Sequence, residues 1–375
     1  MFKIVSGIIE GISVIWDVTL DLFFGKNEFE YLFKQIKLQN LDGHMPILRK
    51  TVEGSNYKAY LFTIPIGLSI EDFKDNKDTI SQYLHKKESD VSMELVNNQA
   101  LITIKEGDVK VSCDYEDYEF NETTKIPIGI DKMTNKIAYW KYLSQSDCHL
   151  IIGGATGSGK STALTEVVSY IVEYIPNIKI YIQDTKTVDL PMFENVDCVE
   201  VYNGGKDHFD ETISNVVDEM KERYKWLKEK KCRNLNEYKG KDKPPHIFYI
   251  VEELNNFNSK HKEDVEFYKN LQLILSQGRA AGISCIVTAQ NPYCDVLPGY
   301  IKSNFLTKLC LKTTTGEASK VLCGNFDLLI DEKIMDGNGH GYLINSDGTN
   351  EIQGFNIQEE TIIQIANKHR KDKDS

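Results

Sequence analysis

The amino-acid sequence predicts an α/β protein whose main domain is built on a mostly parallel sheet. From about residue 125 to 357, strand-like apolar runs alternate with helical segments. The runs, among them HLIIGG, IKIYIQD, HIFYIVEE and SCIVTAQ, are continuously apolar, which indicates strands buried on both faces and joined by crossover helices. A glycine-rich phosphate-binding pattern follows the first run directly. A smaller α+β domain and an N-terminal helix are expected before this sheet.

The composition excludes several classes of protein. The chain has 375 residues, of which 41% are hydrophobic and 27% charged, values typical of a globular protein of about two domains. It contains no apolar stretch of about 18 residues, so the sequence predicts no conventional membrane span. The net charge of −12 excludes a globally basic nucleic-acid coat but not a local basic surface. The eight cysteines form no C-x-x-C pair, which predicts a reducing, cytoplasmic location and no zinc site.

Shifts in composition along the chain predict four parts. They are an N-terminal amphipathic helical segment (1–50), a small α+β domain with an acidic linker (51–124), the main α/β domain (125–358) and a charged C-terminal tail (359–375). Residues 1–25 predict a helix with an acidic stripe of Glu10, Asp17 and Asp21. Surface-bound membrane helices usually carry Lys or Arg on that face. Two interpretations stay open: the helix packs on protein, or it attaches the chain to a membrane or to transfer machinery.

The small domain has clear local signals. A strand-like run, YKAYLFTIP, is followed by Ser69 and Asp72 at the spacing of a capping box, which predicts the start of a helix. Two further strand-like runs flank the dipeptide Asn97-Asn98, which predicts a hairpin turn. Residues 106–124 are acidic and predict a linker or a solvated face.

The phosphate-binding pattern lies in the segment CHLIIGGATGSGKSTA, which satisfies G-x-x-x-x-G-K-[ST]. Glycines allow the backbone to curl so that successive N–H groups point at phosphate oxygens, and the following helix directs its positive end at the same anions. Lys160 is placed to meet the β- and γ-phosphates of ATP, and the Ser161 hydroxyl to bind Mg²⁺. The predicted nucleotide-binding residues are Gly154, Ala155, Thr156, Gly157, Ser158, Gly159, Lys160, Ser161 and Thr162.

Polar residues end two other predicted strands. In IFYIVEELNNF, Glu252 and Glu253 follow a continuous apolar run. An acid at the end of a buried strand can hold the metal through water, and its neighbour can orient the attacking water. We therefore assign Glu252 to the metal side and Glu253 to water activation. Gln290 ends the run SCIVTAQ; it either contacts the γ-phosphate and reports hydrolysis or hydrogen-bonds a loop backbone.

Several segments together resemble the FtsK/SpoIIIE family of DNA translocases. They are GGATGSGKST, IVEEL and SQGRAAGISCIVTAQNPYCDVLPGYIKSNFLTKLCLKT, with support from IPIGID and MKERYKWLKEKKCRNLNEY. The R-A-A-G-I stretch, A-Q-x-P and the Ile-Lys-x-Asn segment discriminate the family better than the phosphate-binding loop alone. The resemblance covers about 125–357. More weakly, IPIGLSIEDFKDNKDTISQYL resembles the small domain of the TcpA-like translocases of conjugative plasmids and integrative elements.

The resemblance implies a RecA-like P-loop NTPase motor that assembles into a hexameric ring and uses ATP to move double-stranded DNA through its centre. Roles transfer only to matching residues: Lys160 and Ser161 in the loop, Glu253 as the catalytic acid and Gln290 as a sensor. Arg279 matches the family's R-A-A-G arginine and is expected near the nucleotide of a neighbouring subunit. The alternative for Arg279 is a charge partner at the end of a helix.

Arginine is scarce, so few residues could act as an arginine finger on the nucleotide of a neighbouring subunit. Within 125–358 only Arg223, Arg233 and Arg279 occur. Lysines are the expected contacts to DNA phosphates, which carry no sequence information. The candidates are Lys302, Lys308 and Lys312 near the Ile-Lys-x-Asn segment, and Lys225, Lys228, Lys230 and Lys231 in the basic helix. The helix cluster could also be an ordinary solvated face.

Three departures from the family pattern qualify the resemblance. The metal-side acid is Glu252, where the family normally has Asp. No winged-helix module that reads DNA sequence is expected after the motor. The sequence also predicts no membrane spans of the kind that the chromosome-segregating members carry. The preferred function is an ATP-dependent double-stranded DNA translocase of a mobile genetic element, active in DNA transfer or conjugation. The alternative is an ATP-switched DNA-binding or assembly protein for replication or partition. A small-molecule kinase would leave the R-A-A-G block unexplained.

Overall fold

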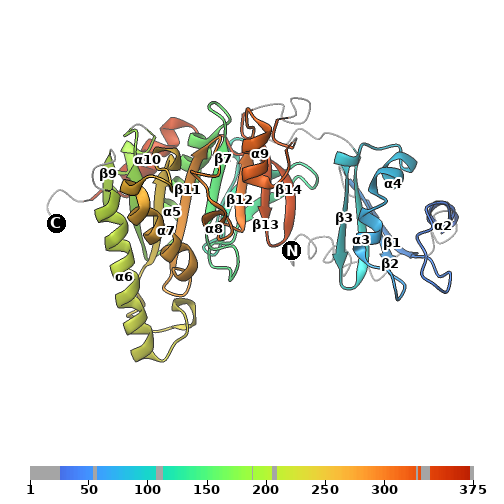
Figure 1. The fold of residues 1–375 in the computed structure, drawn as a ribbon, viewed down its shortest axis with the longest axis horizontal. Coiled ribbons are helices and arrows are strands. Elements are labelled where there is room, and N and C mark those ends of the chain that lie inside the picture. The colour runs from blue at the N-terminus through green and yellow to red at the C-terminus, as the bar shows by residue number, and fades with distance from the viewer. Residues whose placement is uncertain are drawn as a thin grey trace. The chain divides into compact units, whose positions relative to one another are not determined.

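The structure is a computed structural model of the chain, and it describes residues 26–53, 57–106, 113–187, 189–204, 209–326, 328–330 and 338–371. The chain divides into two compact units (Figure 1). The small unit is Met1–Lys110 with Met133–Asn135, and the large unit is Val111–Lys132 with Lys136–Ser375. The predicted amphipathic helix at 1–25 lies outside the described residues. In the described part of the chain, no helix combines the length and the apolar character that crossing a membrane requires.

The small unit contains a four-stranded antiparallel sheet in the order β1-β2-β4-β3. Its strands are β1 (Ile47–Glu53), β2 (Tyr57–Thr63), β3 (Val91–Val96) and β4 (Gln99–Lys105), and its helices are α2 (Lys26–Gln35), α3 (Ile70–Lys74) and α4 (Lys77–Tyr83). Side chains of all three helices share one core with the sheet. At its centre, the ring of Phe33 meets those of Phe62 and Phe73 edge to face, with centroids 5.2 and 5.8 Å away.

Both local signals predicted for the small domain are present. The backbone N–H of Ser69 donates to the Asp72 carboxylate at 2.7 Å, and the capping box at the start of α3 is complete. Asn97 and Asn98 join β3 to β4 with φ values of 49° and 60°. Two successive left-handed residues are typical of the tight turn whose twist matches a hairpin.

The large unit is organised around a ten-stranded sheet in the order β6-β5-β14-β13-β12-β7-β11-β10-β8-β9. The strands are β5 (Ile126–Asp131), β6 (Ile137–Trp140), β7 (Leu150–Gly154), β8 (Ile178–Asp184), β9 (Val199–Gly204), β10 (His246–Glu252), β11 (Ile283–Gln290), β12 (Thr307–Leu311), β13 (His340–Asn345) and β14 (Gly348–Gly354). All pairings from β12 to β9 are parallel, whereas β13, β14, β5 and β6 join antiparallel. The predicted mostly parallel sheet is confirmed.

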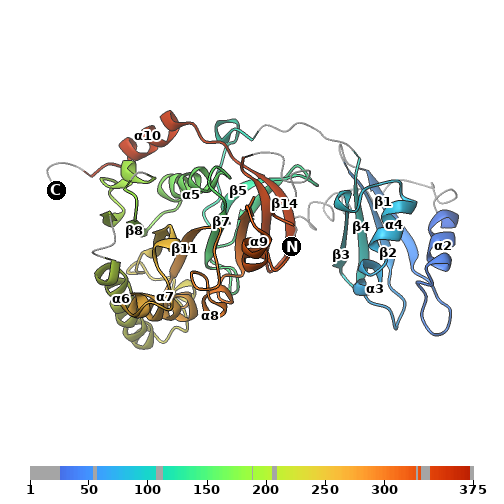
Figure 2. The same ribbon diagram turned by 45° about the horizontal axis from the view of Figure 1, so that its top comes forward.

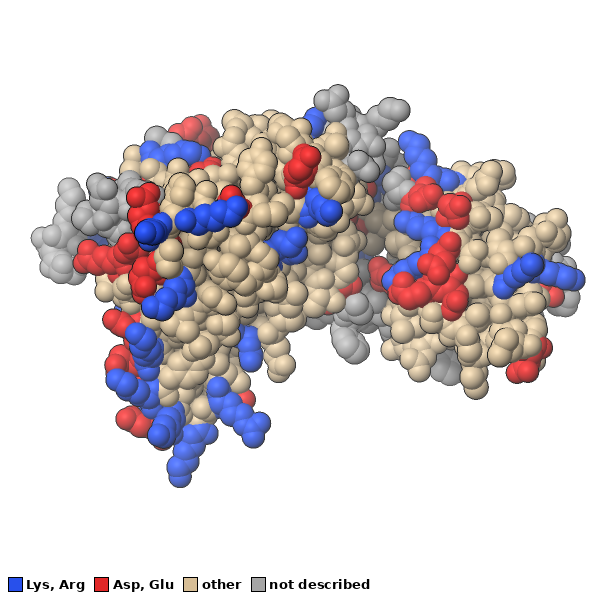
Figure 3. All heavy atoms as spheres, in the orientation of Figure 1, with Lys and Arg blue, Asp and Glu red and all other residues tan. Residues whose placement is uncertain are grey.

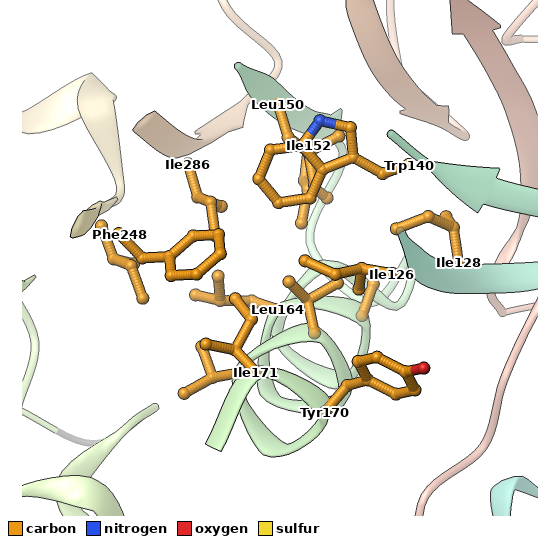
Figure 4. Close-up of a cluster of buried hydrophobic side chains, with 14 of the residues drawn as sticks. Ile126, Ile128, Trp140, Leu150, Ile152, Leu164, Tyr170, Ile171, Phe248 and Ile286 are labelled. Atoms are coloured by element: carbon orange, nitrogen blue, oxygen red, sulfur yellow. The ribbon is translucent and has the colours of Figure 1, made fainter. Parts of the chain in front are cut away.

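Helices cover both faces of this sheet (Figure 2). They are α5 (Lys160–Tyr174), α6 (Phe209–Lys230), α7 (Val265–Gln277), α8 (Gly299–Lys302), α9 (Gly316–Cys323) and α10 (Glu359–Lys368). Single 3-10 turns lie at Glu88–Asp90, Tyr115–Asp117, Pro191–Phe193, Leu235–Glu237, Leu254–Asn256 and Lys262–Asp264. On the α5 face, Leu164 and Ile171 pack on Ile152, Phe248 and Ile286 (Figure 4). This packing anchors α5 on the strands whose ends form the site.

The structure differs from the predicted domain boundaries at both ends of the chain. Strand β1 spans Ile47–Glu53, so the predicted boundary between residues 50 and 51 falls inside a strand of the small unit. Residues 359–368, expected in a charged tail, form α10. Its Ile362 and Ile365 are buried in the core that contains α5. The charged residues concealed a helical spacing of apolar ones.

The predicted acidic linker also belongs in part to the large unit. Tyr115 is buried, and its backbone N–H donates to the carbonyl of Asn356 at 3.0 Å. The ring of Phe120 packs on Tyr115 and Tyr170, with centroids 4.8 and 5.4 Å away. The aromatic residues between the acids therefore supply core contacts that outweigh the polarity of this segment.

Candidate functional site

The carboxyl ends of four neighbouring parallel strands meet at one edge of the large sheet. β7 ends at Gly154, β11 at Gln290, β10 at Glu252 and β8 at Asp184. The strand register pairs Gly154 with Gln290 and Asp184 with Glu252. Open α/β sheets bind their ligands at this edge. The fold thus brings together the phosphate-binding loop, Glu252, Glu253 and Gln290, as predicted from their positions at strand ends.

The loop between β7 and α5 has the backbone that its glycines permit. Gly157 and Gly159 have φ values of +75° and +100°, which side chains with a Cβ rarely adopt. A Cβ on Gly159 would also lie 2.8 Å from the backbone N of Gly339. Lys160 and Ser161 occupy the first turn of α5. The loop and the positive end of the helix therefore have the backbone geometry that favours an anion.

Side chains of the loop and of Gln290 make internal contacts here. The Lys160 ammonium donates to the carbonyl of Ala155 at 2.7 Å, and the Ser158 hydroxyl donates to the same carbonyl at 2.8 Å. The side-chain amide of Gln290 donates to the Thr156 hydroxyl. Burial lowers the pKa of Lys160, against the opposing effect of the Glu253 carboxylate. A phosphate oxygen is a stronger acceptor than a carbonyl, so bound phosphate would draw Lys160 away from Ala155.

The two glutamates that follow β10 are buried, with side chains 4% and 6% exposed for Glu252 and Glu253. Glu253 has φ 62° and ψ 74°, a conformation that is uncommon for a residue with a side chain and recurs at functional sites. Its backbone N–H donates to the Thr288 hydroxyl at 2.8 Å, and its carboxylate accepts from the backbone N–H of Gln290 at 3.2 Å. Neighbouring strand β11 thus positions Glu253.

Glu252 is held from the other side, by the loop after β8. Its carboxylate accepts from the Thr185 hydroxyl at 2.9 Å. Burial raises the pKa of Glu252 to about 7, and the adjoining Asp189 acts in the same direction, whereas Thr185 and Lys186 act to lower it. A metal cation at this carboxylate would favour its ionised form. The Ser161 hydroxyl and the Glu252 carboxylate are hard oxygen donors, which is the donor set that suits Mg²⁺.

Lys186 is a site residue that sequence reasoning missed. Its ammonium lies 3.2 Å from Glu252 Oε1 and 3.3 Å from Glu253 Oε2. The charge of Glu252 and that of Glu253 raise the pKa of Lys186 despite the opposing effect of partial burial. One cation therefore bridges both predicted catalytic acids. No local pattern marked it, because the contact depends on β8 lying beside β10.

Asp184, also missed, fixes the loop that carries Lys186. Its carboxylate accepts from the backbone N–H groups of Lys186, Thr187 and Leu190 at 3.2, 2.9 and 3.1 Å. It also accepts from the Tyr202 hydroxyl at 2.9 Å. The signal was available in the sequence: IKIYIQD is a continuous apolar run that ends in an acid, as IFYIVEE does. Asp184 is fully buried and acts on the backbone of the loop.

A cavity of about 420 Å³ opens beside the acids. It is lined by Lys186, Glu253, Asn255, Asn256, Gln290, Asn291 and Tyr293. Asn255 closes one wall by two hydrogen bonds to the backbone of Gln290, of 2.7 and 2.8 Å. The cavity has the size of a small-molecule site, and its lining is mostly polar.

The three arginines considered for action in trans have different environments. Arg223 is 4% exposed, donates to the carbonyl of Ala281 at 2.9 Å and pairs with Glu219 at 2.8 Å. Arg223 is thus a structural residue, and the expectation that it could act as a finger is wrong. Arg233 is exposed in the loop after α6. Arg279 is exposed between α7 and β11, at the amino edge of the sheet, opposite to the predicted site.

The lysines proposed to contact DNA do not form one group. Lys302 ends α8, and Lys308, whose pKa burial lowers, lies near the start of β12. Lys312 follows the other end of β12, and its carbonyl accepts from the N–H of Ala155 at 2.6 Å. The structure therefore places Lys312 next to the loop and the other two toward the opposite edge.

Lysines and arginines gather over the end of α6 that points away from the sheet (Figure 3). Lys225 pairs with Glu222 at 2.7 Å, and Lys230 pairs with Asp242 at 2.6 Å. Lys228 and Lys231 are exposed. This end of the helix is a basic surface with part of its charge neutralised locally.

Comparison with known proteins agrees with this architecture. Residues 114–292 match the sequence model of the FtsK/SpoIIIE family. DNA translocase FtsK of Clostridium tetani is 29% identical over 230 residues, which are 58% of this chain and 30% of that protein. DNA translocase FtsK of Staphylococcus epidermidis is 26% identical over 296 residues, 74% of this chain and 35% of that protein. The chain spans about a third of the length of these curated relatives.

A solved structure shows the same fold along most of the chain. The pCW3 conjugation coupling protein TcpA, in a monomer form with ATPγS, superposes with a TM-score of 0.61 and 20% identity. The match covers 92% of this chain and 99% of that one. The sequence match contains the phosphate-binding loop, both glutamates and Gln290. The large unit is therefore similar in sequence to the FtsK/SpoIIIE family over residues 114–292, and the chain shares the fold of this coupling protein.

Proposed function

We propose that the chain is an ATPase that moves double-stranded DNA for a mobile genetic element, in DNA transfer or conjugation. The observation that carries the proposal is the convergence of the phosphate-binding loop, Glu252, Glu253 and Gln290 at one edge of an FtsK/SpoIIIE-type sheet. Relatives named DNA translocase FtsK support motion along DNA. The shared fold with a protein named a conjugation coupling protein supports a role in transfer.

Each residue of the proposed site would have a separate role in ATP hydrolysis. The backbone of Gly154–Thr162 and the Lys160 ammonium would bind the phosphates of ATP. Ser161 and Glu252 would hold Mg²⁺, which would neutralise charge that develops on the phosphates. Glu253, fixed by the Gln290 N–H, would orient the water that attacks the γ-phosphate in line. Gln290 would respond to the γ-phosphate, and its contacts with Glu253 and with Thr156 of the loop support this role.

The position of Arg279 supports assembly. It is exposed at the edge of the sheet opposite to the site, so one chain does not bring it to its own nucleotide. In a ring, proposed to be a hexamer, this edge would serve a neighbouring subunit. An arginine that acts in trans accelerates hydrolysis by about 10³–10⁵. The alternative for Arg279, a charge partner at the end of α7, predicts no such effect.

DNA would be held by lysines that contact phosphates, with Lys302, Lys312 and the α6 cluster as candidates. A cytoplasmic location, with the N-terminal segment as a link to a membrane or to transfer machinery, completes the proposal.

The test is ATP hydrolysis by the purified chain with and without duplex DNA. We expect DNA to stimulate turnover, and Lys160→Ala to abolish it because the γ-phosphate loses its cation. Lys269→Ala, on the exposed surface of α7, is the control and should behave as the wild type. Turnover that is indifferent to DNA would refute the motor.

A second function rests on Glu252. A longer acid stands where the family normally has Asp, and its burial raises its pKa to about 7. Both features favour slow hydrolysis and thus a protein that uses ATP as a switch to assemble on DNA. Nucleotide-dependent oligomerisation with negligible turnover would select this function over the motor.

A further inference from the structure

Lys186 occupies a defined position on each glutamate. In Glu252, Oε2 accepts from the Thr185 hydroxyl at 2.9 Å, and Oε1 lies 3.2 Å from the Lys186 ammonium. In Glu253, Oε1 accepts from the Gln290 N–H at 3.2 Å, and Oε2 lies 3.3 Å from the same ammonium. In each carboxylate one oxygen accepts from a neighbouring strand or loop and Lys186 contacts the other, and Glu252 is also hydrogen-bonded to the side chain of Asp189.

The two oxygens that Lys186 contacts are the ones left for the roles proposed above for Glu252 and Glu253. Glu252 requires an oxygen directed at the metal, and Glu253 requires one directed at the attacking water. A lysine ammonium has three donors and neutralises charge as a metal does, but it offers no route to hydrolysis. While Lys186 bridges the pair, its ammonium competes with a metal at Glu252 and with a water at Glu253.

The chain allows the side chain of Lys186 to move while its backbone stays in place. The Asp184 carboxylate holds the N–H groups of Lys186 and Thr187 at 3.2 and 2.9 Å. The Lys186 side chain itself is 46% exposed and lines the cavity that Gln290 also lines. A rotation of the side chain would carry the ammonium from the acids toward this cavity, which Gln290, the residue that donates to the Thr156 hydroxyl of the loop, also lines.

We propose that Lys186 is a positioning residue that covers the working oxygens of Glu252 and Glu253 in the empty site and transfers to the γ-phosphate when metal and ATP bind. The inference rests on the proposed ATPase function. The metal replaces the charge that Lys186 supplies to the acids, and the triphosphate supplies a new anion for the lysine. Glu252 and Glu253 are therefore released only when ATP is present, and Lys186 prevents metal from binding to the acids without the nucleotide.

The first test measures the affinity of the nucleotide-free chain for Mn²⁺. The electron paramagnetic resonance signal of unbound Mn²⁺ reports how much of the ion remains free. Lys186→Met should bind Mn²⁺ about tenfold more tightly than the wild type, because the competing cation is gone. Lys186→Arg keeps the charge and should match the wild type. A purely structural lysine predicts the opposite, since its loss would disorder the acids and weaken the metal. Unchanged or weaker Mn²⁺ binding by Lys186→Met overturns the proposal.

The second test compares ATPγS with ADP, each in the presence of Mg²⁺. Lys186→Met should weaken ATPγS by about tenfold and leave ADP unchanged, because only the triphosphate offers a γ-phosphate. An equal loss for both nucleotides, or none for ATPγS, overturns the transfer. Lys269→Met is the matched control, since that lysine pairs with Glu266 on the surface.

Neither readout needs DNA or turnover, so failure of the lysine proposal can be distinguished from failure of the function. Lys160→Ala should lose both nucleotides. If it retained them, the phosphate-binding site itself would be misassigned, and the Mn²⁺ titration would still decide the role of Lys186.

Discussion

The two edges of the large sheet use charge in different ways. At the carboxyl edge, Glu252, Glu253 and Asp184 are buried, and each is held by groups from a neighbouring strand or loop. At the amino edge, Arg223 is buried against backbone carbonyls, whereas Arg279 stays exposed. The contrast teaches that the acids at the carboxyl edge are fixed by partners within the chain, whereas the amino edge has one arginine that is fixed, Arg223, and one that is exposed, Arg279.

Burial accounts for this division. Charges in a low-dielectric environment must be paired and hydrogen-bonded, so their positions are precisely determined by their partners. Exposed charges remain solvated and adaptable, which suits contact with a second molecule. Lys186 is intermediate, because its ammonium contacts buried acids while its side chain is 46% exposed. The following predictions test this contrast, beginning with the largest expected effect.

Arg279→Ala should lower the DNA-stimulated ATPase rate by about 10³–10⁵ without changing thermal unfolding, because an exposed finger contributes to the transition state and not to the fold. Mixing this variant with Lys160→Ala should restore part of the activity, since an intact Arg279 would then complete an intact loop. Steady-state hydrolysis of the mixture measures this. Full activity of Arg279→Ala alone would remove the amino edge from catalysis.

Glu253→Gln should lower the rate of hydrolysis by about 10²–10⁴, because the amide cannot activate water. ATPγS binding should persist, since an amide oxygen can still accept from the Gln290 N–H. Single-turnover hydrolysis and equilibrium binding separate the two effects. Loss of binding together with turnover would show that Glu253 holds the structure of the site and does not act on water.

Arg223→Met should lower the free energy of unfolding by about 2–4 kcal/mol, because Glu219 Oε1 and the Ala281 carbonyl lose the donor that the buried guanidinium supplies. Urea unfolding measures the loss. Arg233→Met, in an exposed loop, is the matched control and should stay within about 0.5 kcal/mol of the wild type. Similar stability of the two variants would contradict the structural role of Arg223.

Lys228→Glu combined with Lys231→Glu should weaken duplex binding several-fold at low salt and reduce the slope of log affinity against log salt by about 1–2. The reason is the loss of counterion release at two exposed positions. Binding measured at several salt concentrations gives the slope. Glu222→Lys should act in the opposite direction, because it removes the acid that pairs with Lys225. An unchanged slope would identify the end of α6 as an ordinary solvated face.

The smallest effect concerns pH. Burial raises the pKa of Glu252 to about 7, so the folded chain holds a proton that the unfolded chain releases near its ordinary value of 4.5. The contribution of Glu252 to stability is therefore fully present below about pH 4.5 and is lost as pH rises through 7, with about 1 kcal/mol of the loss between about pH 6 and 8. Urea unfolding of the metal-free, nucleotide-free chain should show this fall, and Glu252→Gln should flatten it. A wild type as flat as the variant would exclude the raised pKa.

Local pattern was sufficient for much of the site. The glycine spacing around Lys160 predicted the loop, and the apolar runs before Glu252 and Gln290 predicted the strands that carry them. A buried parallel strand needs a continuous apolar run, and a phosphate-binding turn needs glycines, so both are encoded within a few consecutive residues. The same runs determined the mostly parallel sheet.

Only the tertiary structure decided which charges meet. Lys186 reaches Glu252 and Glu253 because β8 lies beside β10, and Arg223 is structural because α6 packs near the start of β11. Strand order and helix packing depend on contacts between residues far apart in the sequence, so a short stretch of sequence does not determine them. The sequence by itself determined the parts of the nucleotide site, whereas the neighbours of each charge, and hence its role, followed from the way the strands assemble.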